Sequence, residues 1–181
     1  MATVIRNTTV VTGDVGRTVL YDHALAVRDD RIDAVGPSEE IIAAHPGAEI
    51  IDGRGKAIFP GLINCHTHLL AMLDRGILED FGFPTRLRFP VTARSLMTRE
   101  ERQVMAVLGA LEAIHSGTTS LLEISGNLAD YASHLQRTGL RLVLAENIND
   151  VDESGVPESV FRFSESKLEA GLQRSADLIE K

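Results

Sequence analysis

Two histidines separated by one residue, His66 and His68, end the apolar stretch IFPGLINCHTH at residues 58–68. If this stretch is a β-strand, its side chains alternate between two faces, so both imidazoles project to the same side with their Cα atoms about 6.5 Å apart. Two rings on one face can bind a single divalent metal ion. Alternatively, both histidines could lie in the core, where separate hydrogen-bond partners for each ring would offset the cost of burying it. The spacing alone leaves both interpretations open.

Structural roles can explain the other polar residues that could be considered for the site. Cys65 precedes His66 and should point to the opposite face of the strand, so we expect it to pack in the core. It is the only cysteine, which excludes an internal disulfide. His115 is predicted to lie in the last turn of a helix, where a protonated imidazole complements the helix dipole. Glu123, near the end of a later strand, could reach the same pocket, but we favour a supporting contact or exposure to solvent.

Residues 1–57 are predicted to form a small β-rich domain. The segment HALAVRDDRIDAVGP, residues 23–37, has two alternating apolar runs on either side of a DD turn, which is typical of a hairpin. A short helix is predicted within residues 38–47, and a pair of strands on either side of DGRG at residues 52–55. The histidines of this segment lie away from any strand end that could join the site.

From residue 58 onward, strand-like runs alternate with amphipathic helices. Strands are expected near residues 60–66, 119–125 and 141–148, and each is followed by a helical pattern. Thr98 and Glu101 have the spacing of an N-terminal capping box, which places the start of the first helix. This βαβαβα order predicts a parallel sheet with helices outside it, either a doubly wound fold or the start of a (β/α)8 barrel.

Apolar residues recur at helical spacing in each predicted helix and lie on one of its faces. The expected faces are Val104, Val107, Leu108 and Leu111 in the first helix, Leu128, Tyr131 and Leu135 in the second, and Leu168, Leu172, Ser175 and Ile179 in the third. Gly117 and Gly139 are expected to end the first two helices.

Three features favour the barrel over the doubly wound fold. Barrel ligands lie at the carboxyl ends of the strands, where His66 and His68 fall. A doubly wound nucleotide-binding domain would need a glycine-rich turn after its first strand, which HTHLLAML lacks. The connection from Leu69 to Leu96 is also far longer than the usual βα loop of about 2–6 residues. We expect this long connection to cover the substrate or to contact another subunit.

The composition excludes several classes of function. The chain has 181 residues and a net charge of −8, without the clustered Lys and Arg that nonspecific nucleic-acid binding requires. No apolar run approaches the ~20 residues needed to span a bilayer, and the N-terminus lacks the basic-then-apolar order of a signal peptide. We therefore expect a cytoplasmic protein that binds neither nucleic acid nor membranes.

Three segments resemble the amidohydrolase superfamily: PGLINCHTHL at 60–69, ALEAIHSGTTSLLEI at 110–124 and TGLRLVLAENI at 138–148. They are most similar to the branch that contains guanine and cytosine deaminases and triazine hydrolases. The resemblance implies that His66 and His68 are the first two ligands of one catalytic Zn²⁺ ion, with Fe²⁺ as the alternative. The implied reaction is hydrolysis of a C–N or C–halogen bond in a small heterocyclic or amide-type substrate by a metal-activated water.

The resemblance covers only the opening part of the family's pattern. Residues 58–181 provide the first three βα units of a barrel that alone takes roughly 200–250 residues. The remaining metal ligands and catalytic residues are therefore expected beyond Lys181, because a catalytic zinc site normally has three protein ligands. We expect this chain alone to be inactive, the missing part of the barrel to be its partner, and the assembly to be a homo-oligomer.

Two alternatives stay open within this resemblance. Asn64, rather than aspartate, before the histidine pair favours the one-metal branch over two-metal, hydantoinase-like cyclic amidases. An assembly subunit that has kept the fold without the chemistry is the other alternative, although the presence of both histidines argues against it. The chain also departs from the family after the first strand, where PTRLRFP stands in place of the usual Trp-Leu stretch, so the substrate is not assigned.

Overall fold

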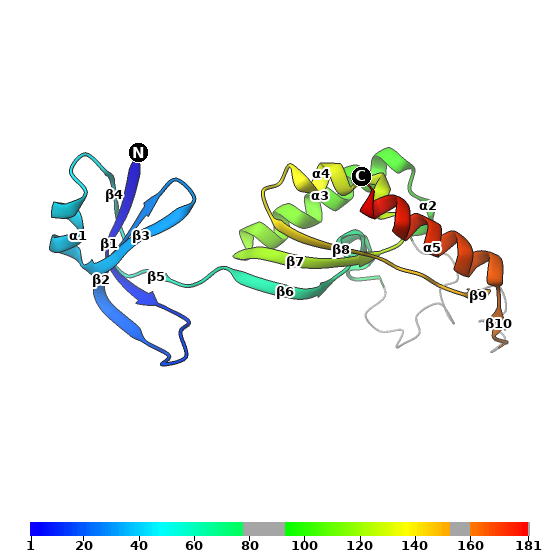
Figure 1. Cartoon of the computed structure of the whole chain (residues 1–181), viewed down its shortest axis with the longest axis horizontal. Coiled ribbons are helices and arrows are strands. Elements are labelled where there is room, and N and C mark those ends of the chain that lie inside the picture. Colours follow the sequence, from blue (N-terminus) through cyan, green and yellow to red (C-terminus); the bar gives the residue numbers. More distant parts are fainter. Residues whose placement is uncertain (78–92, 153–159, 181) are drawn as a thin grey trace. The chain divides into compact units, whose positions relative to one another are not determined.

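The computed structural model describes residues 1–77, 93–152 and 160–180, and the chain divides into two compact units, Met1–Pro60 and Gly61–Lys181. Figure 1 labels the elements of both units. Each unit has its own sheet and its own cluster of buried apolar side chains.

The first unit is a five-stranded sheet with one short helix. In chain order its elements are β1 (Ala2–Val11), β2 (Val19–Arg28), β3 (Arg31–Pro37), α1 (Ser38–Ala44), β4 (Glu49–Asp52) and β5 (Ala57–Ile58). β2 pairs antiparallel with both β1 and β3, so the hairpin predicted for residues 23–37 is confirmed. The helix contributes Ile41 to a buried cluster that also contains Val4, Ala24 and Ala26 of the sheet.

The sequence predicts that the strands on either side of residues 52–55 pair with each other, and this is wrong. β4 and β5 instead pair with successive parts of β1, residues 3–6 and 9–10. Because both run parallel to β1, they point in the same direction and cannot form a hairpin. The Gly53 amide donates to the Arg6 carbonyl at 2.8 Å, so the turn between the two strands lies against β1.

His45 follows α1 and is buried, with 8% of its surface exposed. Its Nδ1 lies 2.7 Å from the Ile41 carbonyl oxygen and its Nε2 lies 3.0 Å from Asp33 Oδ2, which also pairs with Arg28 at 3.1 Å. Both ring nitrogens face acceptors, so both can donate only in the imidazolium form. The Ile41 carbonyl and the Asp33 carboxylate accordingly raise the pKa of His45. The ring therefore ties α1 to β3, most strongly when it is protonated.

The second unit is built on three parallel strands in the order β6-β7-β8. In chain order its elements are β6 (Leu62–Thr67), η1 (Leu69–Asp74), α2 (Ala93–Leu96), α3 (Arg99–His115), β7 (Thr118–Ser125), η3 (Leu128–Asp130), α4 (Ala132–Gln136), β8 (Arg141–Glu146), β9 (Val151–Asp152), β10 (Arg162–Phe163) and α5 (Glu165–Ile179). The three predicted parallel strands are confirmed. Figure 1 shows α3 and α4 on the same side of this sheet. Within the described residues, no helix combines the length and apolar character needed to cross a membrane.

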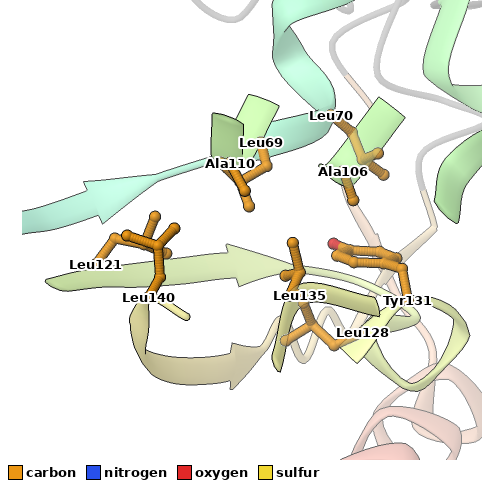
Figure 2. Close-up of a cluster of buried hydrophobic side chains, with 9 residues drawn as sticks. All are labelled: Leu69, Leu70, Ala106, Ala110, Leu121, Leu128, Tyr131, Leu135 and Leu140. Carbon is orange, nitrogen blue, oxygen red and sulfur yellow. The ribbon is translucent and has the colours of Figure 1, made fainter. Parts of the chain in front are cut away.

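Buried apolar side chains fill the space between this sheet and its helices (Figure 2). They are Leu69, Leu70, Ala106, Ala110, Leu121, Leu128, Tyr131, Leu135 and Leu140. Leu128, Tyr131 and Leu135 are fully buried, so the face predicted for the second helix is confirmed. The helix itself is divided between η3 and α4.

The apolar face predicted for the first helix, α3, is not the face that packs against the sheet. α3 buries the small residues Ala106, Gly109 and Ala110. Val104 and Leu108, from the predicted face, are 66% and 46% exposed. The reason is close packing: a Cβ atom on Gly109 would lie 2.8 Å from the Leu69 carbonyl oxygen, so only the smallest residue fits there.

The third helix, α5, shows the same arrangement. Gly171 is buried, whereas Leu168, Leu172 and Ile179 of the predicted face are exposed. The start of α3 is nevertheless as predicted, because Thr98 and Glu101 form its capping box. At the start of α5, the Ser164 hydroxyl accepts from the Lys167 amide.

Candidate metal centre

The two histidines of the HTH motif, residues 66–68, come together at the carboxyl end of β6. Their Nε2 atoms lie 3.2 Å apart, and their ring centroids are 4.9 Å apart with the ring planes at 87°. Both residues are exposed. The rings share one face of the strand, as the alternation of side chains predicts. Their exposure and mutual contact disfavour two separately hydrogen-bonded core histidines.

The positions of the two Nε2 atoms suit a shared metal ion. Two nitrogen ligands of a tetrahedral zinc ion, each about 2.0–2.1 Å from the metal, lie about 3.3–3.4 Å from one another. The His68 Nδ1 donates to the Ile124 carbonyl oxygen, which leaves the lone pair on Nε2. Such a contact fixes both the tautomer and the orientation of a metal-binding histidine. Among the described residues, no group of three or more His, Cys, Asp or Glu side chains is placed to hold a metal.

Side chains hold the backbone before and after the histidine pair. The Asn64 side-chain oxygen accepts from the His66 amide at 3.1 Å. Directly after the pair, the Leu69 amide donates to Glu123 Oε2 at 2.9 Å. The paired residues of β6 and β7 end with Thr67 opposite Glu123, so this contact extends the connection between the strands beyond their backbone pairing.

Glu123 is fully buried, so its expected exposure to solvent is wrong. It also accepts hydrogen bonds from the Ser125 hydroxyl at 2.7 Å and the Tyr131 hydroxyl at 3.1 Å. Burial and the nearby Glu123 charge raise the pKa of the Tyr131 phenol well above its usual value, so it stays a donor. Strand alternation could have identified this burial, because Leu121 lies two residues earlier on the same face.

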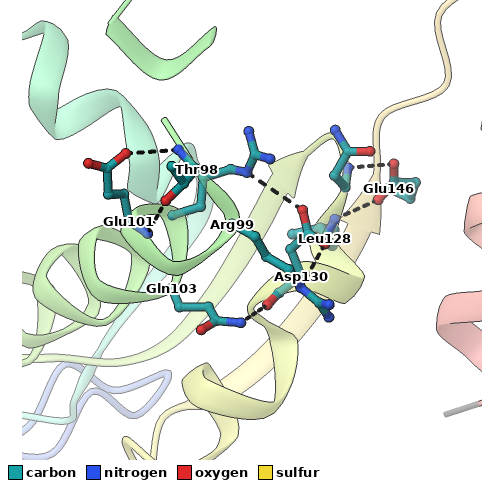
Figure 3. A network of polar contacts seen from close by, with 9 residues as sticks. Thr98, Arg99, Glu101, Gln103, Leu128, Asp130 and Glu146 are labelled. Carbon is teal, nitrogen blue, oxygen red and sulfur yellow. Dashed lines mark hydrogen bonds and ion pairs between the residues drawn. The ribbon is translucent and has the colours of Figure 1, made fainter. Parts of the chain in front are cut away.

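A second buried carboxylate, Glu146, ends β8 and was not identified by sequence reasoning. Its side chain is 1% exposed and accepts from the amides of Asn127 and Leu128 at 2.8 and 2.9 Å. Arg174 of α5 pairs with it at 2.9 Å. Figure 3 shows this carboxylate at the start of η3, near the contacts that Asp130 makes with α3. None of these partners belongs to the HTH motif.

Cys65 is exposed, so its predicted packing in the core is wrong. β6 is an edge strand of the described sheet, and Ile63, on the same face of the strand as Cys65, is also 72% exposed. His115 lies in the last turn of α3, as predicted. Most of the segment expected to cover the substrate or contact another subunit, residues 78–92, lies outside the described residues.

Comparison with known proteins extends these observations. The amidohydrolase family matches residues 57–180, and a bacterial imidazolonepropionase-like composite domain matches residues 24–48. A 5-methylthioadenosine/S-adenosylhomocysteine deaminase of Nitratidesulfovibrio vulgaris (strain DP4) is 34% identical over 149 residues, which covers 81% of this chain and 33% of that protein. The chain spans about a third of the length of the curated relatives it matches.

Solved structures share the arrangement of elements. An adenosine deaminase from Xanthomonas campestris with bound zinc has a TM-score of 0.74 at 26% identity, over 92% of this chain and 37% of that one. An atrazine chlorohydrolase from Arthrobacter aurescens TC1 in complex with zinc has a TM-score of 0.73 at 22% identity, over 98% and 42%. The predicted fold class, the start of a (β/α)8 barrel preceded by a small β-rich domain, is confirmed.

Proposed function

Because this chain belongs to the amidohydrolase family, we propose that it forms the first part of a metal-dependent deaminase acting on adenosine-type nucleosides. The observation that carries the proposal is the pair of Nε2 atoms of His66 and His68, 3.2 Å apart, with the other nitrogen of His68 already bound to a backbone carbonyl. The substrate class is supported by relatives named as deaminases of 5-methylthioadenosine, S-adenosylhomocysteine and 5'-deoxyadenosine.

In this proposal His66 and His68 hold one divalent ion, and zinc is supported by its presence in two similar structures. A bound divalent ion lowers the pKa of water toward about 7 and so supplies hydroxide near neutral pH. The Ile124 carbonyl accepts the Nδ1 proton of His68, which would leave the Nε2 lone pair for the metal. Two histidines are fewer than the three protein ligands usual for catalytic zinc, so we propose that later barrel strands supply the rest.

The proposal is tested on the complete protein by comparing the wild type, His66→Ala and the control His115→Ala, whose ring lies outside the HTH motif. We expect the wild type to contain zinc and to release ammonia from 5'-methylthioadenosine or 5'-deoxyadenosine. His66→Ala should lose zinc binding and ammonia release by about 100-fold or more, because a ligand is removed. His115→Ala should keep both. Full activity in His66→Ala, or no ammonia from a zinc-loaded wild type, would contradict the proposal.

A further inference from the structure

We propose that Glu123 is a positioning residue for the metal centre: by holding the Leu69 amide, it keeps His68 in the orientation that metal binding requires. This inference rests on the proposed function, because it assumes that His66 and His68 bind a metal. It goes beyond the ligand pair, since the hydrogen bonds of Glu123 are to the backbone and to hydroxyl groups rather than to either ring.

The Leu69 amide depends on this carboxylate for its acceptor. Leu69 is 5% exposed, and its amide donates to Glu123 Oε2 at 2.9 Å. Thr67, opposite Glu123, is the last residue of β6 that pairs with β7. The carboxylate therefore takes the place of the backbone carbonyl that a longer strand pair would offer. Because a buried amide without an acceptor is strongly unfavourable, loss of the carboxylate should displace the backbone at Leu69.

Two neighbouring residues of β7 hold His68 at two points. The Ile124 carbonyl accepts from Nδ1 of the ring, and the Glu123 carboxylate accepts from the peptide that follows. The ring stays within reach of Ile124 while this peptide stays at the end of β7. A shift of Leu69 would therefore turn or withdraw the His68 Nε2 from the His66 Nε2, which lies 3.2 Å away.

The carboxylate and the backbone that it holds are both fixed by their surroundings. Ser125 and Tyr131 donate to the other carboxylate oxygen, at 2.7 and 3.1 Å. On its other side, Leu69 meets α3 at Gly109, where a Cβ atom would lie 2.8 Å from the Leu69 carbonyl oxygen. A group held in this way can orient a metal-binding histidine with little loss of conformational entropy on binding.

Glu146 offers a matched control. It is also a buried carboxylate near the carboxyl end of a strand, and it also accepts from backbone amides, those of Asn127 and Leu128. If buried carboxylates in this unit served folding alone, removing either one would have the same consequences. Only Glu123 has a partner that directly follows the histidine pair.

The test measures zinc binding to the complete protein, by competition with a chelator, for the wild type, Glu123→Ala, Glu123→Gln and Glu146→Ala. Glu123→Ala should weaken zinc binding about 10-fold or more, as expected for loss of a group that orients a ligand. Glu123→Gln keeps one acceptor for the Leu69 amide, so its affinity should stay within about threefold of the wild type. Glu146→Ala should lower the urea midpoint but keep zinc affinity within about twofold.

A second measurement needs no metal. Because the His68 Nδ1–H donates to the Ile124 carbonyl, the signal of the Nδ1–H tautomer should be visible in the ¹⁵N chemical shifts of the ring in the metal-free wild type. We expect this signal to persist in Glu146→Ala and to be lost in Glu123→Ala. A persistent signal in Glu123→Ala would show that His68 is held without Glu123.

The positioning role is overturned by unchanged zinc affinity in folded Glu123→Ala, or by an equal loss in Glu146→Ala. A wild type that binds no zinc overturns the proposed function as well. Zinc bound by the wild type, lost in His66→Ala and unaffected in Glu123→Ala overturns the positioning role alone. If Glu123→Ala does not fold, Ser125→Ala is the deciding variant, because it loosens the carboxylate but leaves its contact with the Leu69 amide. About two- to threefold weaker zinc binding in Ser125→Ala supports the positioning role, and unchanged zinc binding overturns it.

Discussion

His45 in the first unit and His68 in the second each have Nδ1 bound to a backbone carbonyl, but their second nitrogens meet different partners. The Nε2 of His45 lies 3.0 Å from the Asp33 carboxylate, whereas the Nε2 of His68 lies 3.2 Å from the Nε2 of His66. A carboxylate favours a proton on the nitrogen that faces it, so His45 is suited to a structural tie. The imidazole of His66, in contrast, leaves the lone pair on the Nε2 of His68 available, so His68 is suited to bind a metal.

The largest effects are expected from two separate variants, one without the His68 ring and one without the His45 ring. His68→Ala in the complete protein should weaken zinc binding, measured with a competing chelator, by about 100-fold or more. Its exposed ring contributes little to folding, so the urea midpoint should change little. His45→Ala should do the opposite, keeping zinc affinity and losing protection of the α1 amides in hydrogen exchange. Loss of zinc in His45→Ala but not in His68→Ala would reverse the assignment of the two histidines.

Gly109→Ala tests whether the backbone beside His68 is held as tightly as the packing indicates. Alanine inside a helix normally gains about 1 kcal/mol over glycine. Here its Cβ would lie 2.8 Å from the Leu69 carbonyl oxygen. We therefore expect a net loss of about 1–3 kcal/mol in the free energy of unfolding, measured with urea. Zinc affinity should fall as Leu69 is displaced.

A suitable control is Gly126→Ala, because the nearest atom to a Cβ there lies 4.0 Å away. This variant should change the free energy of unfolding by less than about 1 kcal/mol. If Gly109→Ala proved more stable than the wild type, the close contact between α3 and Leu69 would not restrain the site.

A change of pH should have a smaller effect on stability, and only through the contacts of His45. The Ile41 carbonyl and Asp33 carboxylate raise the pKa of His45. Its contribution to stability is therefore complete below the unfolded-state pKa of about 6.5 and is lost as the pH rises through the folded-state value. Hydrogen bonds from His45 and Arg28 lower the pKa of Asp33, whose contribution is complete above about pH 3.9 and lost as the pH falls through its folded-state value.

Hydrogen exchange of the α1 amides should therefore be slowest, after correction for the intrinsic rate, between roughly pH 4 and 6.5. Protection should decline on the alkaline side of this range. His45→Gln, which cannot carry a charge, should remove that alkaline decline. If the decline persisted in His45→Gln, a different group would be responsible for it.

The smallest effect is expected for Cys65→Ser. The thiol is exposed and lies on the face of β6 opposite to the two rings, so the free energy of unfolding should change by less than about 0.5 kcal/mol. Zinc affinity, measured with the same chelator, should be unchanged. A clear loss of zinc affinity would show that the thiol is a further ligand beside His66 and His68.

The sequence predicts the positions of strands and helix starts better than the helix faces. The HTH motif and the Thr98 cap depend on local spacing, which is visible in the sequence. The face of α3 depends on how closely it approaches Leu69, and close approach selects Gly109 rather than the larger Leu108. Apolar periodicity identifies large residues, and on α3 these do not lie on the face that meets the sheet.

The buried carboxylates were harder to predict for a different reason. Acidic residues are almost always exposed unless they are paired. The partners that allow Glu123 to be buried include the Leu69 amide, 54 residues away, which no local pattern reveals. Its position two residues after Leu121 on a strand was the one available signal.

The contacts that hold the His68 segment join residues that are 54 and 56 positions apart in the chain. At a synthesis rate of about 5–20 residues per second, roughly 3–11 s separate the appearance of His68 from that of Ile124. During that interval β7 can fix neither the tautomer nor the backbone of the histidine. Closing a loop takes well under a millisecond, so translation rather than folding sets this delay. In the proposed function, the arrangement that suits this pair to a metal can therefore form only after β7 has emerged from the ribosome.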